Sequence, residues 1–225
     1  PGPRVGRGYH LAMTSRPRLT RARVAAAALD YVDAHGLAAL SMRKLGGALG
    51  VEAMSLYNHV TNKDDLLDAV SDLLYREVLA GFVPAADASW QDDARAMVVA
   101  VRSVALRHPE ALDLLIGRGL PTSIRNEFLD ACYRIFTKAG FGTEDAAMAF
   151  DVASSWITGV HTQELGLMAT LEPLGSETTA RRDGDPPADA VADFAAACMA
   201  WSPEQRFAFG LETLLAGLER QLAMR

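Results

Sequence analysis

Apolar residues recur at helical spacing along almost the entire chain, and no stretch alternates convincingly between apolar and polar residues, as a half-buried β-strand would. Capping residues and glycines separate the helical patterns. Ser202 and Pro203, for example, form a typical helix start, and Gly140 is a typical stop. The patterns cover residues 20–35, 42–49, 52–59, 62–79, 90–107, 109–116, 121–139, 143–168, 187–200 and 203–224. The sequence therefore predicts an all-α protein.

The length and composition are those of a folded protein with room for more than one domain. Of the 225 residues, 50% are hydrophobic and 22% are charged, which excludes wholesale disorder. We expect a disordered arm or an upstream extension at residues 1–18, a first domain at 19–66 and a second at 67–225. Within the second domain, the polar segment 172–187 is rich in Gly and Pro and predicts a mobile loop.

The sequence shows neither a membrane segment nor a metal-binding motif. No uncharged stretch approaches the ~20 apolar residues of a membrane helix, and the first residues lack the apolar run of a secretory signal. Cys132 and Cys198 lie 66 positions apart, so they form neither a metal clip nor a disulfide framework. We therefore expect a cytoplasmic protein without membrane contact, metal or cofactor.

The net charge of −6 is unevenly distributed along the chain. Residues 1–63 carry nine Arg and Lys against three acids, a net charge of +6, whereas residues 64–225 carry a net charge of −12. A basic end can neutralise phosphates, while an acidic body repels them. The asymmetry is compatible with nucleic acid at the N-terminal end. A basic arm that is merely solvated is the alternative.

Residues 41–59 contain two short helical patterns joined by a tight turn at Gly50 and Val51. The turn is too short for antiparallel helices, so the two helices must cross steeply. This is the helix-turn-helix layout, in which the second helix enters the major groove of DNA. Leu45 and Leu49 supply buried positions. The donors available to bases or phosphates are Arg43, Lys44, Ser55, Tyr57, Asn58, His59 and Lys63.

These same residues carry a resemblance to a known family. The stretch SMRKLGGALGV, followed by LYNHVTNKDDLLDA, is similar to the core pattern of the tetracycline repressor (TetR) family, and the similarity extends over residues 19–80. Residues 90–220 resemble the C-terminal domain of the tetracycline-repressor branch. The resemblance implies a homodimeric repressor with two helix-turn-helix heads on a palindromic double-stranded DNA operator. It also implies a ligand pocket in each helical C-terminal domain, and release from DNA when a small-molecule effector binds.

The resemblance further implies which residues read bases. Arg43 is expected to pair with guanine through its planar guanidinium. Met54 and Ser55 are expected against base edges, and Asn58 is expected to read adenine. Ala53 stands where some relatives place a polar base reader, so one contact is expected to be absent.

Three residues are expected, by the same resemblance, to hold phosphates: Tyr57, His59 and Lys63. Alternatives remain open for two of them, because Tyr57 could be a core aromatic of the head and His59 a helix C-cap. The full set that we expect at the DNA is Ser41, Arg43, Lys44, Met54, Ser55, Tyr57, Asn58, His59 and Lys63.

The C-terminal half combines Met, aromatic and small residues with few charges among them. This composition favours a cavity for a largely apolar ligand that one or two polar groups orient. The expected ligand-binding residues are Trp90, Met97, Phe128, Cys132, Phe150 and Trp156, with His161 and Gln163 as the polar groups. Packing at a dimer interface is the alternative role for those on the long helix at 143–168.

Residues 203–224 carry a long apolar stripe. Its members recur at steps of three and four and are Phe207, Leu211, Leu214, Leu215, Leu218 and Leu222. We expect this stripe to be too long to bury within one chain. The sequence thus predicts a homodimer in which helices 143–168 and 203–224 form a four-helix bundle.

The resemblance implies that tetracycline-binding relatives use a histidine to ligate the magnesium ion that the drug carries. The corresponding stretch here is LLIGRGLP, with Ile116 or Gly117 near that place, so tetracycline with magnesium is not the expected effector. Two rival functions are a helical small-molecule-binding enzyme and a non-specific architectural DNA-binding protein. The chain has no HExxH, GxSxG or GxGxxG motif, and an architectural protein is expected to be basic throughout.

Overall fold

The computed structural model describes residues 18–84, 87–116, 122–164, 166 and 188–224. Within these ranges the chain forms helices and turns and no strand, so the all-α prediction is confirmed. The α-helices are α1 (Arg21–His35), α2 (Met42–Leu49), α3 (Ala53–Leu56), α4 (Lys63–Gly81), α5 (Trp90–Arg107), α6 (Leu112–Ile116), α7 (Ser123–Ala139), α8 (Thr143–Glu164), α9 (Ala188–Ala200) and α10 (Pro203–Ala223). The expected loop 172–187 and residues 1–17 of the expected arm lie outside the described residues.

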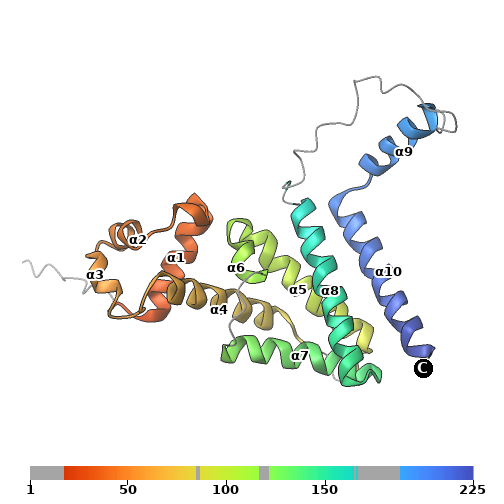
Figure 1. The fold of residues 1–225 in the computed structure, drawn as a ribbon, viewed down its shortest axis with the longest axis horizontal. Helices are drawn as coiled ribbons and strands as arrows, with labels where there is room; N and C mark the ends of the chain where they lie inside the picture. Colours follow the sequence, from red (N-terminus) through yellow and green to blue (C-terminus); the bar gives the residue numbers. More distant parts are fainter. Residues whose placement is uncertain (1–17, 85–86, 117–121, 165, 167–187, 225) are drawn as a thin grey trace, which may run out of the picture.

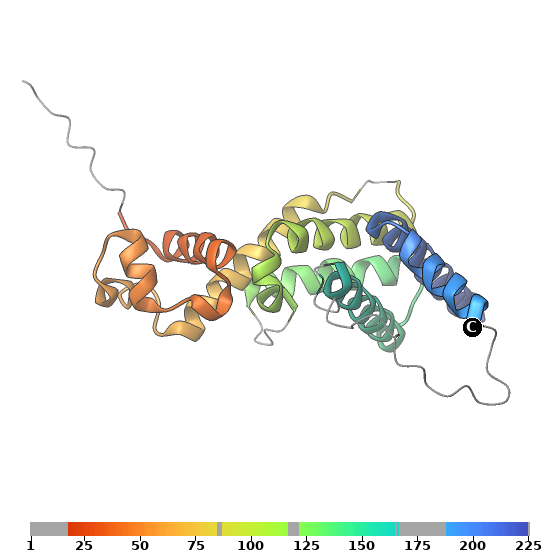
Figure 2. The same ribbon diagram turned by 90° about the horizontal axis from the view of Figure 1, so that it is seen from above.

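The helices form an elongated molecule with a small head at one end (Figure 1). Helices α1, α2 and α3 make the head, and α4 runs from the head into a larger body that contains α5 to α8 and α10 (Figures 1 and 2). The core of the head comes from these three helices and the start of α4, and it includes the fully buried residues Val24, Val32, Leu45, Leu56 and Leu66. Burial of each such side chain contributes roughly 1.5–3 kcal/mol to the stability of the fold, so this small core holds the helices of the head together.

Two glycines allow α2 and α3 to cross closely. Gly50 ends α2 with a φ of 67°, in the left-handed region that glycine adopts without strain. The backbone N–H of Val51 then donates to the carbonyl of Gly46, at 2.9 Å. A Cβ atom on Gly46 would lie only 2.9 Å from the carbonyl oxygen of Val51. The close approach of α2 and α3 therefore depends on the missing side chain at Gly46, and the steep crossing stays a prediction.

Some helix ends differ from the predicted ones. The regular part of α3 covers only Ala53–Leu56, and the rest of the predicted helix 52–59 is a turn in which His59 N–H donates to the Leu56 carbonyl at 2.9 Å. Helix α7 starts two residues later than predicted, because the Thr122 side chain caps it by accepting from the Arg125 N–H at 3.2 Å. The end of the predicted helix 143–168 lies outside the described residues, apart from Gly166.

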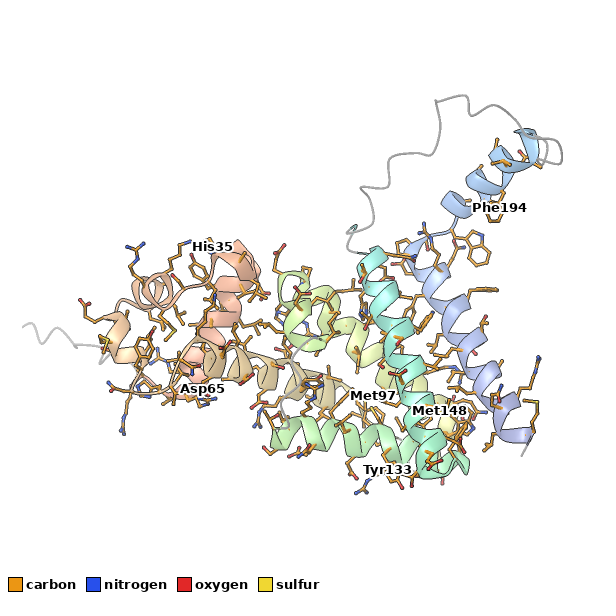
Figure 3. All side chains as sticks on the ribbon, viewed as in Figure 1. His35, Asp65, Met97, Tyr133, Met148 and Phe194 are labelled. Atoms are coloured by element: carbon orange, nitrogen blue, oxygen red, sulfur yellow. The ribbon has the colours of Figure 1, made fainter. Side chains whose placement is uncertain are left out.

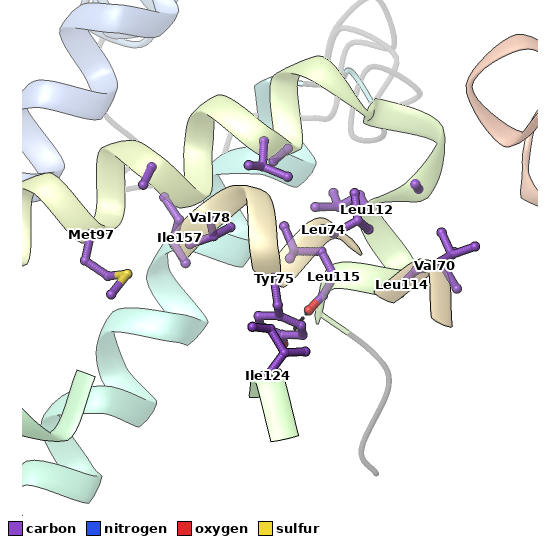
Figure 4. Packing of buried hydrophobic residues seen from close by; sticks show 14 of the residues in the cluster. Val70, Leu74, Tyr75, Val78, Met97, Leu112, Leu114, Leu115, Ile124 and Ile157 are labelled. Atoms are coloured by element: carbon purple, nitrogen blue, oxygen red, sulfur yellow. Dashed lines mark hydrogen bonds between the residues drawn. The ribbon is translucent and has the colours of Figure 1, made fainter. Parts of the chain in front are cut away.

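Helix α4 is the element that joins the head to the body. It packs against α1 in the head and against α5, α6 and α7 in the body. In the body, Ser71 Oγ donates to the carbonyl of Leu114, and Tyr75 Oη donates to that of Leu115, both at 2.8 Å; Figure 4 shows the second bond as a dashed line. These two bonds attach α4 to α6, so a shift of the body at α6 is transmitted to α4.

The stripe on α10 is buried within one chain, contrary to expectation. Phe207, Leu211, Leu215 and Leu218 are buried, and the stripe's other two leucines pack partly buried against the same core. Helix α10 turns this face toward α8 of its own chain. The expectation that this stripe is too long to bury within one chain is therefore wrong, and the stripe gives no support for a dimer.

Helix α9 extends away from the body (Figures 1 and 3). It precedes α10 in the chain, and its Val191 and Phe194 are exposed. Figure 3 places Phe194 beyond the body, far from Asp65 in the head.

Candidate DNA-binding face and ligand cavity

The residues expected at the DNA belong to elements of the head. They come from α2, from α3 with its following turn, and from the first residue of α4, at the end of the molecule far from α8 and α10 (Figure 1). Arg43, Lys44, Met54, Tyr57, Asn58 and Lys63 are exposed, whereas Ser41, Ser55 and His59 are half-buried. The head thus carries three cationic side chains and several hydrogen-bond donors at these positions, which suits a polyanion.

Two residues of the predicted pattern act as helix caps. Ser41 Oγ accepts from the backbone N–H of Lys44 at 3.3 Å, which fixes the start of α2. Asn62 Oδ1 accepts from the N–H of Asp65 at 2.8 Å and fixes the start of α4. Lys63 is consequently the first residue of α4, where its charge and the helix N-terminus are both positive.

An ion pair braces the turn that follows α3. Arg21 of α1 contacts the Asp65 carboxylate at 2.6 Å and donates to the backbone carbonyl of His59 at 3.4 Å. The hydrogen bond from Arg21 is the main reason that the pKa of Asp65 falls from 3.8 to about 2. The pair is therefore ionised at neutral pH, and it holds α1 against the segment that carries the predicted phosphate contacts.

The structure decides the two alternatives for Tyr57 and His59. Tyr57 is 43% exposed, and the neighbouring Leu56 fills the core position instead. Tyr57 is also the residue at the C-cap of α3, so His59 is not. Tyr57 is thus not a core aromatic and His59 is not the C-cap of α3, so both side chains remain candidates for contact with DNA. Their contacts with DNA stay a prediction.

The body contains a cavity of about 590 Å³, within the usual range of roughly 300–1,000 Å³ for small-molecule sites. Its wall comes from α4, α5, α6, α7, α8 and α10. Met97, Phe128, Cys132 and Phe150, four of the eight residues predicted to bind a ligand, line it. The ring of Phe128 lies 5.1 Å from that of Tyr75 and 6.5 Å from that of Phe150, so these three aromatic residues form one cluster in the wall.

The other four predicted residues do not line the cavity, and their assignment to its wall is wrong. Trp90 packs edge-on against Phe141, with ring centroids 6.2 Å apart. Trp156 packs on Phe207 at 5.6 Å in the contact between α8 and α10. Gln163 is exposed, and His161 is completely buried. Helical spacing assigns a residue to a face, but it does not say which neighbour that face meets.

His161 lies in the packing between helices. Neither of its ring nitrogens has a hydrogen-bond partner among the described residues, and burial lowers its pKa, so the ring is neutral at pH 7. Nearby, Arg102 of α5 pairs with Glu164 of α8 at 2.6 Å, and its guanidinium lies 4.5 Å from the ring centroid of Phe207. This cluster fastens α5, α8 and α10 to one another.

Sequence reasoning missed most of the cavity wall. The missed residues include Tyr75, Val98, Val101, Leu115, Arg125, Ile135, Leu211 and Leu214. The aliphatic members carry no signal that separates them from an ordinary core. Arg125 lies in the mostly polar segment 122–127, a pattern typical of a solvated face. The one available signal was the position of Tyr75 on the apolar side of α4, since a buried tyrosine hydroxyl needs a hydrogen-bond partner.

None of the described helices is long and apolar enough to cross a membrane.

Comparisons with known proteins agree with this architecture. Residues 24–70 match the family described as "Bacterial regulatory proteins, tetR family", and residues 83–222 match the "Tetracyclin repressor-like, C-terminal domain". An HTH-type transcriptional regulator of Saccharopolyspora erythraea is 34% identical over 216 residues, which cover 91% of this chain and 86% of that protein. Tetracycline repressor protein class D of Escherichia coli is 30% identical, with 91% of each chain covered.

Two solved structures of ActR from Streptomyces coelicolor are similar over nearly their whole length. Apo ActR has a TM-score of 0.74 and is 26% identical, covering 92% of this chain and 97% of that one. ActR in complex with actinorhodin has a TM-score of 0.73, again at 26% identity, covering 91% and 99%. Both halves of the chain thus match one family, and the chain belongs to the tetR family of bacterial regulatory proteins.

Proposed function

We propose that this chain is a transcriptional repressor that binds a palindromic DNA operator as a homodimer and leaves it when a largely apolar small molecule occupies the cavity. The observation that carries the proposal is the course of α4. It begins at Lys63, one of the residues predicted to contact DNA, and its Tyr75 lines the cavity. Twelve residues of helix, about 18 Å, connect the two sites. As a bacterial regulator of DNA, the protein acts in the cytoplasm.

The head supplies two kinds of DNA contact. Arg43 on α2, with Met54, Ser55 and Asn58 on α3 and its following turn, approaches base edges, where sequence is read. The remaining predicted residues hold the backbone and set the register; they are Ser41, Lys44, Tyr57, His59 and Lys63. The capping role of Ser41 supports its placement at the N-terminus of α2, where a hydroxyl and free backbone amides suit a phosphate.

Outward faces of α8 and α10 supply the dimer contact. Met148 and Val152 on α8 and Phe209 on α10 are exposed apolar side chains. Gly217 lies on α10, and a Cβ atom there would meet nothing within 4 Å. Apolar side chains beside such an open position allow the helices of a second copy to pack closely. The faces differ from the buried stripe of α10, so one chain can use both.

Ligand binding acts on the DNA through α4. The cavity holds Tyr75 of α4 and Leu115 of α6, which are already joined by a hydrogen bond. A ligand that binds tighter to one position of α4 shifts the population toward that position, whereas equal binding shifts nothing. A changed separation of the two heads then mismatches half-sites whose centres are roughly 34–36 Å apart. The structure of ActR in complex with actinorhodin supports a small-molecule ligand for a protein of this fold.

A gel-shift assay with the DNA upstream of the chain's own gene tests the proposal. A discrete complex that resists excess random DNA is the expected result, and a smear that random DNA removes would indicate an architectural protein. Arg43→Ala is expected to weaken specific binding by about 1–3 kcal/mol, and Lys63→Ala to weaken all sequences similarly. Equal loss on specific and random DNA in Arg43→Ala would make Arg43 a phosphate contact. No complex with any DNA, from a folded dimer, would refute the function.

A further inference from the structure

The described wall of the cavity contains little charge. Among the described residues of its wall, Arg125 is the one charged side chain. It stands in the first turn of α7, beside Tyr75 of α4, whose ring centroid lies 5.6 Å from the guanidinium carbon. Figure 4 shows Tyr75 next to Ile124 of the same turn, with Met97 of the cavity wall set apart from them.

The other polar groups of the wall are already satisfied or are neutral. The Tyr75 hydroxyl donates to the Leu115 carbonyl at 2.8 Å. The Ser154 and Thr158 hydroxyls donate to carbonyls of their own helix, at 3.0 Å and 2.8 Å. Burial raises the pKa of the Cys132 thiol to about 12, so it stays protonated at neutral pH. Arg125 is therefore the strongest donor that the wall offers to a ligand.

Arg125 has no anionic partner among the residues that the structure describes. No carboxylate of the described residues forms an ion pair with it, and its recorded contact is the face of Tyr75. The first turn of α7 contains no acid either. A cation at a helix N-terminus is electrostatically unfavourable, because the helix dipole is positive there. A half-buried guanidinium in this position costs stability that a bound anion would return.

The apolar part of the site continues from Arg125 along one side of α7. Phe128, Cys132, Ile135 and Phe136 follow at helical spacing, and all line the cavity. From Arg125 to Phe136 this row is about 16 Å long at 1.5 Å per residue. A ligand that matches it has an acidic group at one end and an apolar ring system behind it.

We propose that the ligand of this cavity is an amphiphilic anion, an apolar ring system bearing a carboxylate that Arg125 holds at the α4 end of the cavity. This inference rests on the proposed function, since it takes the cavity as the effector site. It adds the chemical class and the orientation of the effector. The carboxylate lies against the Tyr75 wall of α4, where its binding acts directly on the helix that reaches the DNA.

Two fluorescent probes with the same ring system test the inference. 1-Pyrenebutyrate carries a carboxylate, and 1-pyrenebutanol replaces it with a neutral hydroxyl. We expect wild-type protein to bind the acid roughly 10- to 100-fold more tightly than the alcohol, the range of a charge-assisted bidentate pair. Arg125→Gln is expected to abolish that preference by weakening the acid alone, and Arg125→Lys to retain part of it. Fluorescence titration at pH 7 gives the dissociation constants.

Arg134→Gln is the matched control. Arg134 lies on the same helix, and its substitution removes the same charge. Its side chain is exposed, pairs with Asp130 at 2.8 Å and does not line the cavity. The Arg134→Gln variant should prefer 1-pyrenebutyrate over 1-pyrenebutanol by the same factor as the wild type. Thermal unfolding should show Arg125→Gln to be at least as stable as the wild type, because the unpaired cation is removed.

The outcomes separate the two claims. If wild-type protein binds both probes equally, or if Arg125→Gln weakens both by the same factor, Arg125 does not hold an anion and the inference is wrong, while a ligand cavity remains. If neither probe binds to the wild-type protein, the cavity does not accept ring systems of this kind. The proposed ligand site and this inference then fall together.

Discussion

Gly46 is the single residue on which the geometry of the helix-turn-helix depends most directly. An added Cβ would lie 2.9 Å from the Val51 carbonyl oxygen and 3.1 Å from the Ala53 nitrogen, which are backbone atoms that cannot move aside alone. We expect Gly46→Ala to destabilise the head by about 1–3 kcal/mol. Gly47→Ala is the matched control. A Cβ there meets nothing within 4 Å, so this change should stabilise the helix by about 0.5–1 kcal/mol. Urea unfolding compares them, and equal effects would contradict the close crossing.

Asp65 gives the head a defined dependence on pH. Its pKa is lowered from 3.8 to about 2, first by the Arg21 hydrogen bond and further by bonds from Thr61. A depressed pKa means that the stabilisation is present above the unfolded value of 3.8 and disappears as the pH falls toward 2. Asp65→Asn should cost about 1 kcal/mol at pH 7, since the pair is partly exposed. Unfolding measured from pH 7 to pH 2 should show the two proteins converging below pH 4. A constant difference would mean that the ion pair contributes nothing.

At the scale of elements, a polar cluster joins α1 of the head to the body. His108, at the C-cap of α5, contacts Asp33 of α1 at 2.7 Å and Glu77 of α4 at 3.3 Å, and Arg107 also pairs with Glu77. The His108 side chain is largely buried between these carboxylates. Head and body are thus connected by a second route beside α4.

A double-mutant cycle measures this connection. His108→Ala and Asp33→Ala should show a coupling energy of about 1 kcal/mol in unfolding experiments, because each removes a partner from a partly buried pair. Amide exchange at the C-terminal end of α1 should also become faster, while α7 is unaffected. The control cycle uses Arg134 and Asp130, an exposed pair within α7, for which we expect less than about 0.5 kcal/mol. Equal coupling in both cycles would remove the special role of His108.

The sequence predicts elements better than it predicts the contacts between them. The bounds of α2 and the start of α10 follow from local signals, Ser41, Gly50 and Ser202, whose capping roles need no distant partner. No local signal in the sequence determines what the apolar stripe on α10 packs against. Whether Phe207 meets α8 of its own chain or a second copy depends on the tertiary arrangement.

The cavity is the part of the site that the sequence predicts least well. Four of its wall residues, Met97, Phe128, Cys132 and Phe150, were predicted because Met, aromatic and small residues with few charges among them favour an apolar cavity. Arg125 was missed because a single arginine in a polar turn is typical of a surface. Its position becomes visible only when α4 brings Tyr75 against it.

At the scale of the whole molecule, the exposed faces of α8 and α10 predict how two chains associate. Phe209→Glu places a charge on the outward face of α10, where the native side chain is 63% exposed. We expect at least a tenfold weaker dimer, because an unpaired charge must then be desolvated at the interface. Leu129→Glu on α7, also at an exposed apolar residue, is the control and should leave the dimer intact. Light scattering at micromolar concentration distinguishes them. A wild-type monomer, or dimers in both variants, would contradict this interface.

Selection of binding sites from a pool of random double-stranded DNA, followed by sequencing, tests the central claim that two heads of a homodimer read one palindromic operator. We expect enrichment of an inverted repeat with half-site centres one helical turn apart, roughly 34–36 Å, or a multiple of it. Arg43→Ala should lose preference at the same position in each half-site, as a base contact requires. Enrichment of an unrepeated motif would contradict the dimeric arrangement, and no enrichment at all would contradict sequence-specific DNA binding.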